Sequence, residues 1–591
     1  MAPRLLLFGL LLAYILMIYP YTFNYEVDID NAYFFLTLAA AAYLLYMGTR
    51  TIGRCAQSLP AGLACTVVIL LCLLLIRMPD YNEHRMNILS LVLMSSLVWT
   101  SDARLLRKTA LVIVLFFLVE LSIGIAGWLT ATEFPELSIT GTMGNSGVYI
   151  ACVVVTLPLL AYVADTTSVT PERRPWISIL ISLFFVCVFW LILAVRARAA
   201  LLAFVVIVFC LLTARGQKKP PWLTARRRII FLGGLTAIVL AGVLFMLTWY
   251  SPAKTGSIYG RLLMLQVMKE HWSFKFWWGV GPGNFTLYYP GWQAAYFGHH
   301  PSAPPTLLLH AGESYLVFNE LIVLFKELGA AGLSILTLLL IGFYRLRCAD
   351  HPRYMAAVKL TVTSILVLSL FSYPFHVAYT AFLFIFCGIT GFASGIRLPA
   401  GWSSSSRAGS ILHFSNIILC SIVCVFAGQK AAAVLAWQDI DRNPALSYHQ
   451  KAAALEKMLP ALRYDAKFLV AYGELLSQDS ACLDRAIVLL EQSKRYFLSY
   501  RSIVSTANAC RYAMRYPQAI DNYRFLACYV PSRFSPKYEL MKLYLKQRDT
   551  GEAKIMAKEI TAMPVKIPSP EVDFMRAEAL HYLHLLPDAD L

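Results

Sequence analysis

The sequence predicts an all-α protein that crosses a membrane about thirteen times and carries a soluble helical-repeat domain after the last crossing. Composition gives the first indication, because 58% of the 591 residues are hydrophobic and only 14% are charged, whereas soluble chains carry about 25% charged residues. The mean hydropathy is +0.61. The second indication is a series of apolar segments of spanning length, and the third is a drop in hydropathy after Gln429.

The predicted membrane domain covers residues 1–428 and begins with the segment RLLLFGLLLAYILMIYPYTF. A positive flank precedes this apolar run and no small-residue cleavage site follows it, so we expect an uncleaved first helix rather than a signal peptide. The segments of spanning length are 5–23, 31–48, 61–77, 87–100, 109–130, 147–165, 176–195, 199–213, 229–250, 321–343, 358–373, 376–396 and 411–428.

Basic residues gather on one set of the loops between these segments. They are Arg50, Arg54, Arg104, Arg107, Lys108, Arg173, Arg174, the run RGQKKPPWLTARRR, Arg345, Arg347 and Arg353. The alternate loops NYEVDID and ATEFPELSITGTMGNSG contain neither Lys nor Arg. Because cytoplasmic loops are the ones enriched in Lys and Arg, we predict a cytoplasmic N-terminus, with Arg196, Arg198, the loop 251–320 and the C-terminal domain outside. We attribute the net charge of +17 to the basic residues of the predicted cytoplasmic loops, and we expect no nucleic-acid partner.

Two arginines interrupt the apolar stretch WLILAVRARAALLAFVVIVF, at Arg196 and Arg198. A guanidinium in hydrocarbon costs roughly 2.5–3.5 kcal/mol on insertion scales, so a turn between two membrane helices at the outer surface is the expected location. There the arginines act either as snorkelling anchors or, with Arg261, as an anion-binding site. For the pair together with Arg261 we favour the anion site.

Three further stretches stand out on the predicted outer side. In GRLLMLQVMKEHWSFKFWWGVGPGNF, 260–285, four residues share one helical face that suits a helix lying at the membrane interface; they are Leu262, Leu265, Met268 and Trp272. The others are LLLHAGESYLVFNELIVLFKELGAAG, 307–332, and TGTMGNSGVYIA, 140–151. In the last of these, Asn145 is expected to cap the following helix and could also contact a ligand. The aromatic residues of NFTLYYPGWQAAYFGHH favour an interfacial belt over a sugar platform.

No motif for a cofactor or a metal is present. GVGPGNF lacks the GK[ST] of a phosphate-binding loop and the strand–helix context of a dinucleotide fingerprint. His299, His300 and His310 have no metal-ligand spacing, so we predict neither metal nor cofactor. Ten of the thirteen cysteines lie in or beside apolar segments, and the remaining Cys482, Cys510 and Cys528 form no CxxC pair.

The C-terminal region, 429–591, contains helical sequence with a period near 34 residues. Ala486, Ala519 and Ala553 are spaced by 33 and 34 residues, and Pro531 and Pro564 close two of the units. A small residue on the second helix and a terminal proline resemble tetratricopeptide repeats, although the Trp-Leu-Gly part of that pattern is missing. A generic helical bundle is the alternative. Stacked repeats offer a concave face for a protein partner.

Four stretches together resemble the O-antigen ligase family, which includes bacterial protein O-oligosaccharyltransferases and is related to O-antigen polymerases. They are TGTMGNSGVY, VRARAALLAF, GRLLMLQ with GVGPGNF, and NELIVLFKELGAAGL, all within about residues 130–345. Their order, spacing and sidedness agree with the family, and appended helical repeats also occur in it. The resemblance implies a GT-C-type membrane glycosyltransferase fold.

The resemblance also implies a function. The expected donor is a glycan on undecaprenyl diphosphate, transferred outside the bacterial inner membrane without metal or nucleotide sugar. Arg198 and Arg261 match the arginines of the family that bind the donor diphosphate, and Arg196 is a supporting charge. Guanidinium groups bind phosphate oxygens bidentately and stay charged at physiological pH. They would stabilise the departing lipid diphosphate, and a single displacement would invert the anomeric centre.

The general base is the point at which this sequence departs from the family. The family histidine is expected one to three residues before the asparagine that opens a helix, here Asn319, but those positions hold Leu316, Val317 and Phe318. We favour His310, nine residues upstream of Asn319, as the base, since nearby guanidinium groups would keep it neutral. Glu313 is the second choice, and Glu320 is a further candidate.

The acceptor stays open at this point. A glycan ligase would use a hydroxyl of the lipid A core or of a protein Ser or Thr, whereas a polymerase would use a second lipid-linked repeat. A non-enzymatic transporter or scaffold is a third possibility, but it predicts polar residues along a path through several helices, and here the charges gather at one face. The expected partners are the donor, the acceptor, membrane lipids and a protein bound to the repeats.

Overall fold

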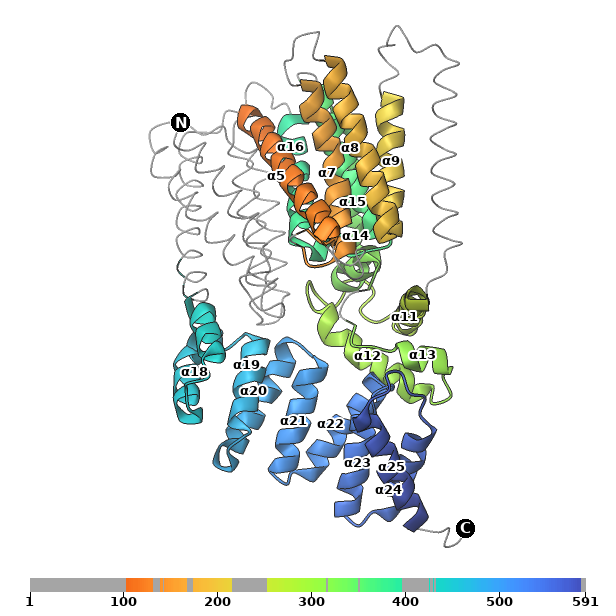
Figure 1. Ribbon diagram of the computed structural model, residues 1–591, viewed down its shortest axis with the longest axis vertical. Coiled ribbons are helices and arrows are strands. Elements are labelled where there is room, and N and C mark those ends of the chain that lie inside the picture. The colour runs from red at the N-terminus through yellow and green to blue at the C-terminus, as the bar shows by residue number, and fades with distance from the viewer. Residues whose placement is uncertain are drawn as a thin grey trace.

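The computed structural model describes residues 103–130, 139–141, 143–166, 174–214, 252–314, 317–348, 351–395 and 432–585, together with the single positions 425 and 429. Every regular element within these ranges is a helix. Figure 1 shows them in three layers: a bundle of apolar helices, a thin layer of short helices beneath it, and a curved row of C-terminal helices.

The bundle contains α5 (Ala103–Thr130), α7 (Ser146–Thr166), α8 (Arg174–Val195), α9 (Arg198–Ala214), α14 (Glu320–Arg345), α15 (Pro352–Ser369) and α16 (Ala378–Gly395). Each coincides with a predicted apolar segment. Within the described residues, three stretches are long and apolar enough to cross a membrane, Ile113–Thr130, Ser146–Thr166 and Glu320–Arg345. The predicted segments 5–23, 31–48, 61–77, 87–100, 229–250 and 411–428 lie outside the described residues.

Helix α7 lies at the centre of the bundle. It packs against α5, α8, α9 and α15, and residues all around its circumference are buried, including Tyr149, Val154 and Leu157. The hydroxyls of Thr156 and Tyr379 are 2.8 Å apart, which joins α7 to α16. Helix α8, by contrast, exposes Leu183 among other large apolar side chains. An exposed apolar face of this kind suits contact with lipid.

The turn between α8 and α9 contains only Arg196 and Ala197. The amide of Ala197 donates to the carbonyl of Ile192 at 3.1 Å, and the amide of Arg196 donates to Leu193 at 3.1 Å. This pair of bonds is a Schellman ending, which requires a left-handed residue after the helix. Arg196 takes that conformation with φ 57°. Arg196 therefore stands in the turn between two apolar helices, and Arg198 is the first residue of the second one.

The middle layer consists of α11 (Pro252–Glu270), α12 (Phe285–His299) and α13 (Pro305–His310). Its apolar core includes Val267, Phe285 and Tyr289. The expected interfacial face of α11 is exposed at Leu262 and Leu265, and Figure 1 shows α11 beneath the end of α9. Met268, assigned to the same face, is instead buried. The reason is that this residue also lies next to Val267 on the face turned toward α12 and α13.

The glycine-rich turn after α11 is joined to a break in α14. Gly329 interrupts the helix with φ 70°. On either side of it the backbones pair: the amide of Val280 donates to Lys326 at 2.7 Å, and the amide of Ala330 donates to Phe276 at 2.9 Å. Gly279 and Gly329 face each other so closely that a Cβ on either would overlap the backbone of the other segment.

Lys326 fixes the first part of α14 to the end of α11. Its ammonium donates to the carbonyls of His271 and of Trp272, the latter at 3.0 Å. It also lies 5.5 Å from the ring centroid of Trp292. A cation satisfies the free carbonyls at a helix C-terminus well. Lys326 is therefore held by the middle layer, and the largely apolar part of α14 begins after Gly329.

The C-terminal row contains α18 (Tyr448–Leu462), α19 (Ala466–Leu476), α20 (Leu483–Tyr496), α21 (Tyr500–Tyr512), α22 (Tyr516–Tyr529), α23 (Phe534–Lys546), α24 (Thr550–Ala562) and α25 (Pro570–Leu585). Successive helices pack on one another. Helices α19, α21 and α23 start at 466, 500 and 534, which gives a spacing of 34 residues. The structure thus consists of stacked helix pairs, and their resemblance to tetratricopeptide repeats stays a prediction.

Small residues allow the helices of a pair to approach closely. Ala486, Ala519 and Ala553, the residues on which the sequence period rests, are each 0% exposed. Gly473 on α19 faces α20, where a Cβ would lie 2.6 Å from the Cγ of Leu490. Ala507, 34 residues later on α21, is also fully buried. Gly473 and Ala507 are thus the small residues on the first helix of their pairs, a position that the period of Ala486, Ala519 and Ala553 did not include.

The C-terminal row packs directly on the middle layer. Helix α12 lies against α22, and Ala294 of α12 belongs to the apolar core of the row. The side-chain amide of Gln293 donates from Nε2 to the backbone carbonyl of Tyr529 at 2.7 Å. The backbone amide of Tyr500 donates to the carboxylate of Glu313 at 2.7 Å. These contacts place the C-terminal row on the same side of the bundle as the loop 251–320.

Candidate functional site

The candidate site lies where the bundle meets the middle layer. The start of α9, the middle of α11, the start of α14 and the turn between α15 and α16 contribute the side chains that meet there. The turn contains the short 3₁₀ helix η3 (Pro374–His376). Each helix contributes an end or a polar face, so charged side chains can gather without entering the apolar bundle.

Arg198 and Arg261 are brought together at this place from separate elements. Arg198 is the first residue of α9 and Arg261 lies on α11. Partial burial and the positive charge of Arg198 both lower the pKa of Arg261. An arginine keeps its charge at neutral pH despite such a shift. Within the described part of the chain, neither arginine forms an ion pair with a carboxylate.

Two aromatic residues adjoin the arginines. The guanidinium of Arg261 lies over the ring of Phe318, 4.3 Å from its centroid. The ring of Phe318 lies 5.5 Å from that of Tyr373, whose charge when ionised would raise the pKa of Arg261. Phe318 occupies a position where the family resemblance implies a histidine. Here that position supports the guanidinium through a cation–π contact.

Asn319 and Glu320 open α14 and tie it to η3. The side chain of Asn319 accepts from the amide of Ile322 at 3.2 Å, so this residue is the N-cap of the helix. The carboxylate of Glu320, only 1% exposed, accepts from the amide of Phe375 at 3.1 Å and from Nδ1 of His376 at 2.9 Å. Glu320 is thus engaged by η3 and is not turned toward solvent.

His376 is a member of the site that the sequence did not reveal. The predicted segment 376–396 placed it inside a membrane helix, whereas in the structure it ends η3, outside α16. Its side chain is 36% exposed. Burial lowers the pKa of His376, but its hydrogen bond to Glu320 and the charges of Glu320 and Glu327 outweigh burial and raise the pKa overall. The only sequence signal was a histidine at the edge of an apolar segment.

His310, the base favoured from the sequence, lies at the end of α13 beside α11. Its Nδ1 is 2.6 Å from the carbonyl of Thr306, and its ring lies 5.4 Å from that of Tyr259. Tyr259 is two residues before Arg261 on the same helix. His310 therefore stands at the edge of the arginine site, next to an aromatic residue and with a neutral hydrogen-bond partner.

Glu313, the second choice for the base, contributes to the contact with the C-terminal row. Its carboxylate accepts from the amide of Tyr500, and the guanidinium of Arg533 lies 3.8 Å from the centre of the Tyr500 ring. These partners belong to α21 and to the residue before α23. The structure thus places Glu313 in the interdomain contact, while its catalytic role stays a prediction.

Asn145 occupies the cap position expected from the sequence. Its side-chain oxygen accepts from the amides of Gly147 at 2.9 Å and Val148 at 3.1 Å, at the start of α7. Gly141 precedes it with φ 53°, and a Cβ there would lie 2.6 Å from a carboxylate oxygen of Glu120. The TGTMGNSG stretch is therefore a tight turn that starts α7.

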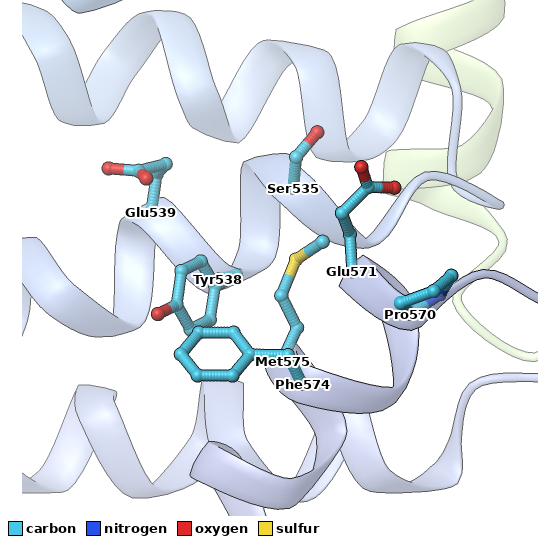
Figure 2. Close-up of a pocket in the computed structure, with 7 residues that line it drawn as sticks. All are labelled: Ser535, Tyr538, Glu539, Pro570, Glu571, Phe574 and Met575. Atoms are coloured by element: carbon cyan, nitrogen blue, oxygen red, sulfur yellow. The ribbon is translucent and has the colours of Figure 1, made fainter.

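A separate groove lies on the C-terminal row, between α23 and α25. It is an open groove with a volume of about 420 Å³, lined by Ser535, Tyr538, Glu539, Pro570, Glu571, Phe574 and Met575. Figure 2 shows that the rings of Tyr538 and Phe574 lie side by side at its centre. Their centroids are 6.5 Å apart. The groove is mainly apolar. Its lining residues are distant in the sequence from Arg198 and Arg261.

Residues with metal-binding side chains do not gather in the described ranges: no three of His, Cys, Asp and Glu lie close enough there to hold an ion.

Comparison with known proteins identifies no relative of this chain. No family model, curated protein or solved structure matches the chain.

Proposed function

We propose that this protein transfers a glycan from an undecaprenyl diphosphate carrier to an acceptor hydroxyl, at the outer surface of a bacterial inner membrane. The observation that supports this most strongly is the pair Arg198 and Arg261, which come from separate helices at one end of an apolar bundle. Two neighbouring guanidinium groups repel each other unless an anion lies between them. An anion bound at the surface of a membrane is the chemistry that this arrangement suits.

The donor diphosphate meets the requirements of that anion. Each guanidinium can donate two parallel hydrogen bonds to phosphate oxygens. During transfer the acceptor oxygen attacks the anomeric carbon, and the bond from that carbon to the diphosphate oxygen breaks. Negative charge then grows on the departing diphosphate, so fixed arginines stabilise the transition state more than the ground state. Arg196, in the adjoining turn, adds positive potential.

The acceptor and the surrounding architecture are part of the proposal. A hydroxyl of the lipid A core or of a protein is favoured, because a stacked helical row beside the site can present a protein surface. An O-antigen polymerase remains the alternative, with a second lipid-linked repeat as acceptor. We further propose about thirteen crossings, a periplasmic site, a tetratricopeptide-like C-terminal domain and no requirement for metal.

A transfer assay with purified protein tests the proposal. Detergent-solubilised protein is incubated with an undecaprenyl diphosphate-linked glycan and either lipid A core or an acceptor protein, with and without excess EDTA. We expect glycan on one acceptor, release of lipid diphosphate, and the same rate in EDTA. Activity that EDTA abolishes and Mg²⁺ restores would contradict the metal-free mechanism, while failure to consume the donor with any acceptor would contradict transfer itself.

A further inference from the structure

Glu320 and His376 form a carboxylate–imidazole pair at the candidate site. Nδ1 of His376 lies 2.9 Å from a carboxylate oxygen of Glu320. The carboxylate is itself held by the backbone amide of Phe375 and is almost fully buried. Nε2 of His376 makes no hydrogen bond within the described residues. A buried carboxylate that fixes one ring nitrogen leaves the other nitrogen available as a proton acceptor.

We propose that His376 is the general base that accepts the proton of the acceptor hydroxyl, and that Glu320 is the positioning residue that orients its ring. This inference rests on the proposed glycan transfer and names the group that activates its nucleophile. The acceptor O–H gives its proton to Nε2 while its oxygen bonds to the anomeric carbon. The bond from that carbon to the diphosphate breaks, and the diphosphate leaves with the electron pair.

The location of His376 relative to the arginines supports this role. Arg261 lies over Phe318, Phe318 contacts Tyr373, and the amide of His376 donates to the carbonyl of Tyr373 at 3.1 Å. The base and the group that holds the leaving oxygen act on opposite faces of the sugar in an inverting reaction. The contacts through Phe318 and Tyr373 connect the proposed base to Arg261, the residue proposed to hold the leaving diphosphate.

The two histidines near the site differ in their hydrogen-bond partner. Nδ1 of His310 bonds the neutral carbonyl of Thr306, whereas Nδ1 of His376 bonds a carboxylate. A carboxylate stabilises the imidazolium that forms when the base takes a proton more strongly than a neutral carbonyl does. His310 also faces the ring of Tyr259. The electrostatic surroundings therefore favour His376 over His310 as the base.

The charged groups that act on His376 determine the expected pH dependence. Glu320 and Glu327, both on α14, raise its pKa against the opposing effect of burial. The last turn of α15 and the first turn of α16 also pack against η3 and contain no charged residue. The titratable side chains nearby are Tyr379, in the first turn of α16, and Tyr373, the residue before η3. Since only neutral imidazole is a base, transfer should rise with pH through a midpoint above the usual histidine value of about 6.5.

The decisive experiment compares substitutions in the full-length protein, assayed with undecaprenyl diphosphate-linked glycan and the acceptor on which the wild type is active. His376→Asn keeps a donor near the position of Nδ1, so the bond to Glu320 survives, but it removes Nε2. We expect kcat to fall by about 100-fold or more, with KM for the donor changed less than about threefold. His299→Asn, at an exposed position at the end of α12, is the matched control and should keep the wild-type rate.

The pH–rate profile of Glu320→Gln distinguishes a positioning role of Glu320 from a merely structural one. Loss of the carboxylate charge should move the rising limb of the pH–rate profile to lower pH and reduce the maximal rate. Wild-type kcat in His376→Asn, or a large loss in His310→Asn instead, would overturn the assignment to His376 while leaving glycan transfer in place. A wild-type protein that never consumes the donor would overturn the transfer proposal and this inference together.

Discussion

Arg196 adopts a backbone conformation that normally favours glycine. Its φ of 57° closes the turn between α8 and α9. A non-glycine residue in this left-handed region costs about 1 kcal/mol or more. Strained residues of this kind cluster at functional sites, and the turn with Arg196 leads directly into Arg198. Met514 and Arg548 end α21 and α23 in the same conformation, so a role for the Arg196 side chain has to be tested separately from its role in the turn.

A pair of substitutions at Arg196 separates backbone strain from charge. Arg196→Gly and Arg196→Ala both remove the guanidinium, but only glycine relieves the left-handed conformation. We expect Arg196→Gly to be more stable than Arg196→Ala by about 1 kcal/mol, measured by thermal unfolding in detergent. Both should lose transfer activity to the same modest extent. Equal stability of the two variants would contradict the left-handed turn, and full activity in both would make Arg196 an anchor only.

Individual site residues could be predicted only partly from the sequence. Arg196 and Arg198 stood out because charge in an apolar stretch needs an explanation, and Asn145 stood out as a helix cap. His376 gave no such signal, because it borders an apolar segment and its partner Glu320 is 56 residues away in the sequence. A contact between residues so far apart depends on how α14 and η3 pack, which no local pattern in a single sequence encodes.

At the scale of elements, the pairing of the glycine-rich turn with the break in α14 positions both the middle layer and the start of α14. Gly279 and Gly329 approach each other with positive φ values of 65° and 70°. Lys326, just before the break, bonds the carbonyls at the end of α11. The orientation of Phe318, Asn319 and Glu320 depends on this arrangement, because they stand at the beginning of the same helix.

Gly329→Ala tests this pairing, with Gly342→Ala as a control in the same helix. At Gly329 an alanine would be left-handed, and its Cβ would overlap the carbonyl of Trp277. We expect a loss of about 2 kcal/mol or more in the free energy of unfolding. Gly342 has open space around it, so alanine there should stabilise the helix by about 0.5–1 kcal/mol. Similar unfolding temperatures for the two variants would contradict the observed backbone pairing.

Whether an element could be predicted from the sequence depends on how far apart in the chain the residues that determine it lie. The bounds of α8 and α9 agree closely with the predicted segments 176–195 and 199–213, because apolar length and the arginines between them are local features. The break at Gly329 was not predicted, since its cause is a backbone segment that lies 50 residues earlier, at Gly279. A glycine within an apolar helix does not by itself reveal which backbone approaches it.

At the scale of the whole molecule, the C-terminal row is fixed to the middle layer. The packing of α12 on α22, the bond from Gln293 to Tyr529 and the contact of Glu313 with Tyr500 hold both parts on one side of the helix bundle. The repeat period could be predicted from the sequence, because small residues recur along the chain. It did not predict the docking, because Gln293 and Ala294 belong to no recurring pattern.

A topology reporter fused after Leu591 tests the side on which this assembly lies. Because the distribution of Lys and Arg predicts that the loop 251–320 lies outside, we expect the docked C-terminal row to be outside too. A reporter that fluoresces only in the cytoplasm should stay dark, and a phosphatase that folds only in the periplasm should be active. The opposite pattern would show that the assembly faces the cytoplasm and that the number of crossings must be revised by one.

We propose that Arg198 and Arg261 together bind a lipid-linked diphosphate, and the rate of glycan transfer by their lysine variants tests this binding most directly. Lysine keeps the charge but loses the planar pair of donors, and a hydrogen bond to a charged group contributes about 1.5–3 kcal/mol. Arg198→Lys and Arg261→Lys should each reduce transfer, normalised to protein amount, by roughly 10- to 100-fold, and alanine should reduce it further. Snorkelling anchors predict the opposite, because lysine snorkels as well as arginine. Wild-type transfer rates in both lysine variants would contradict the diphosphate site.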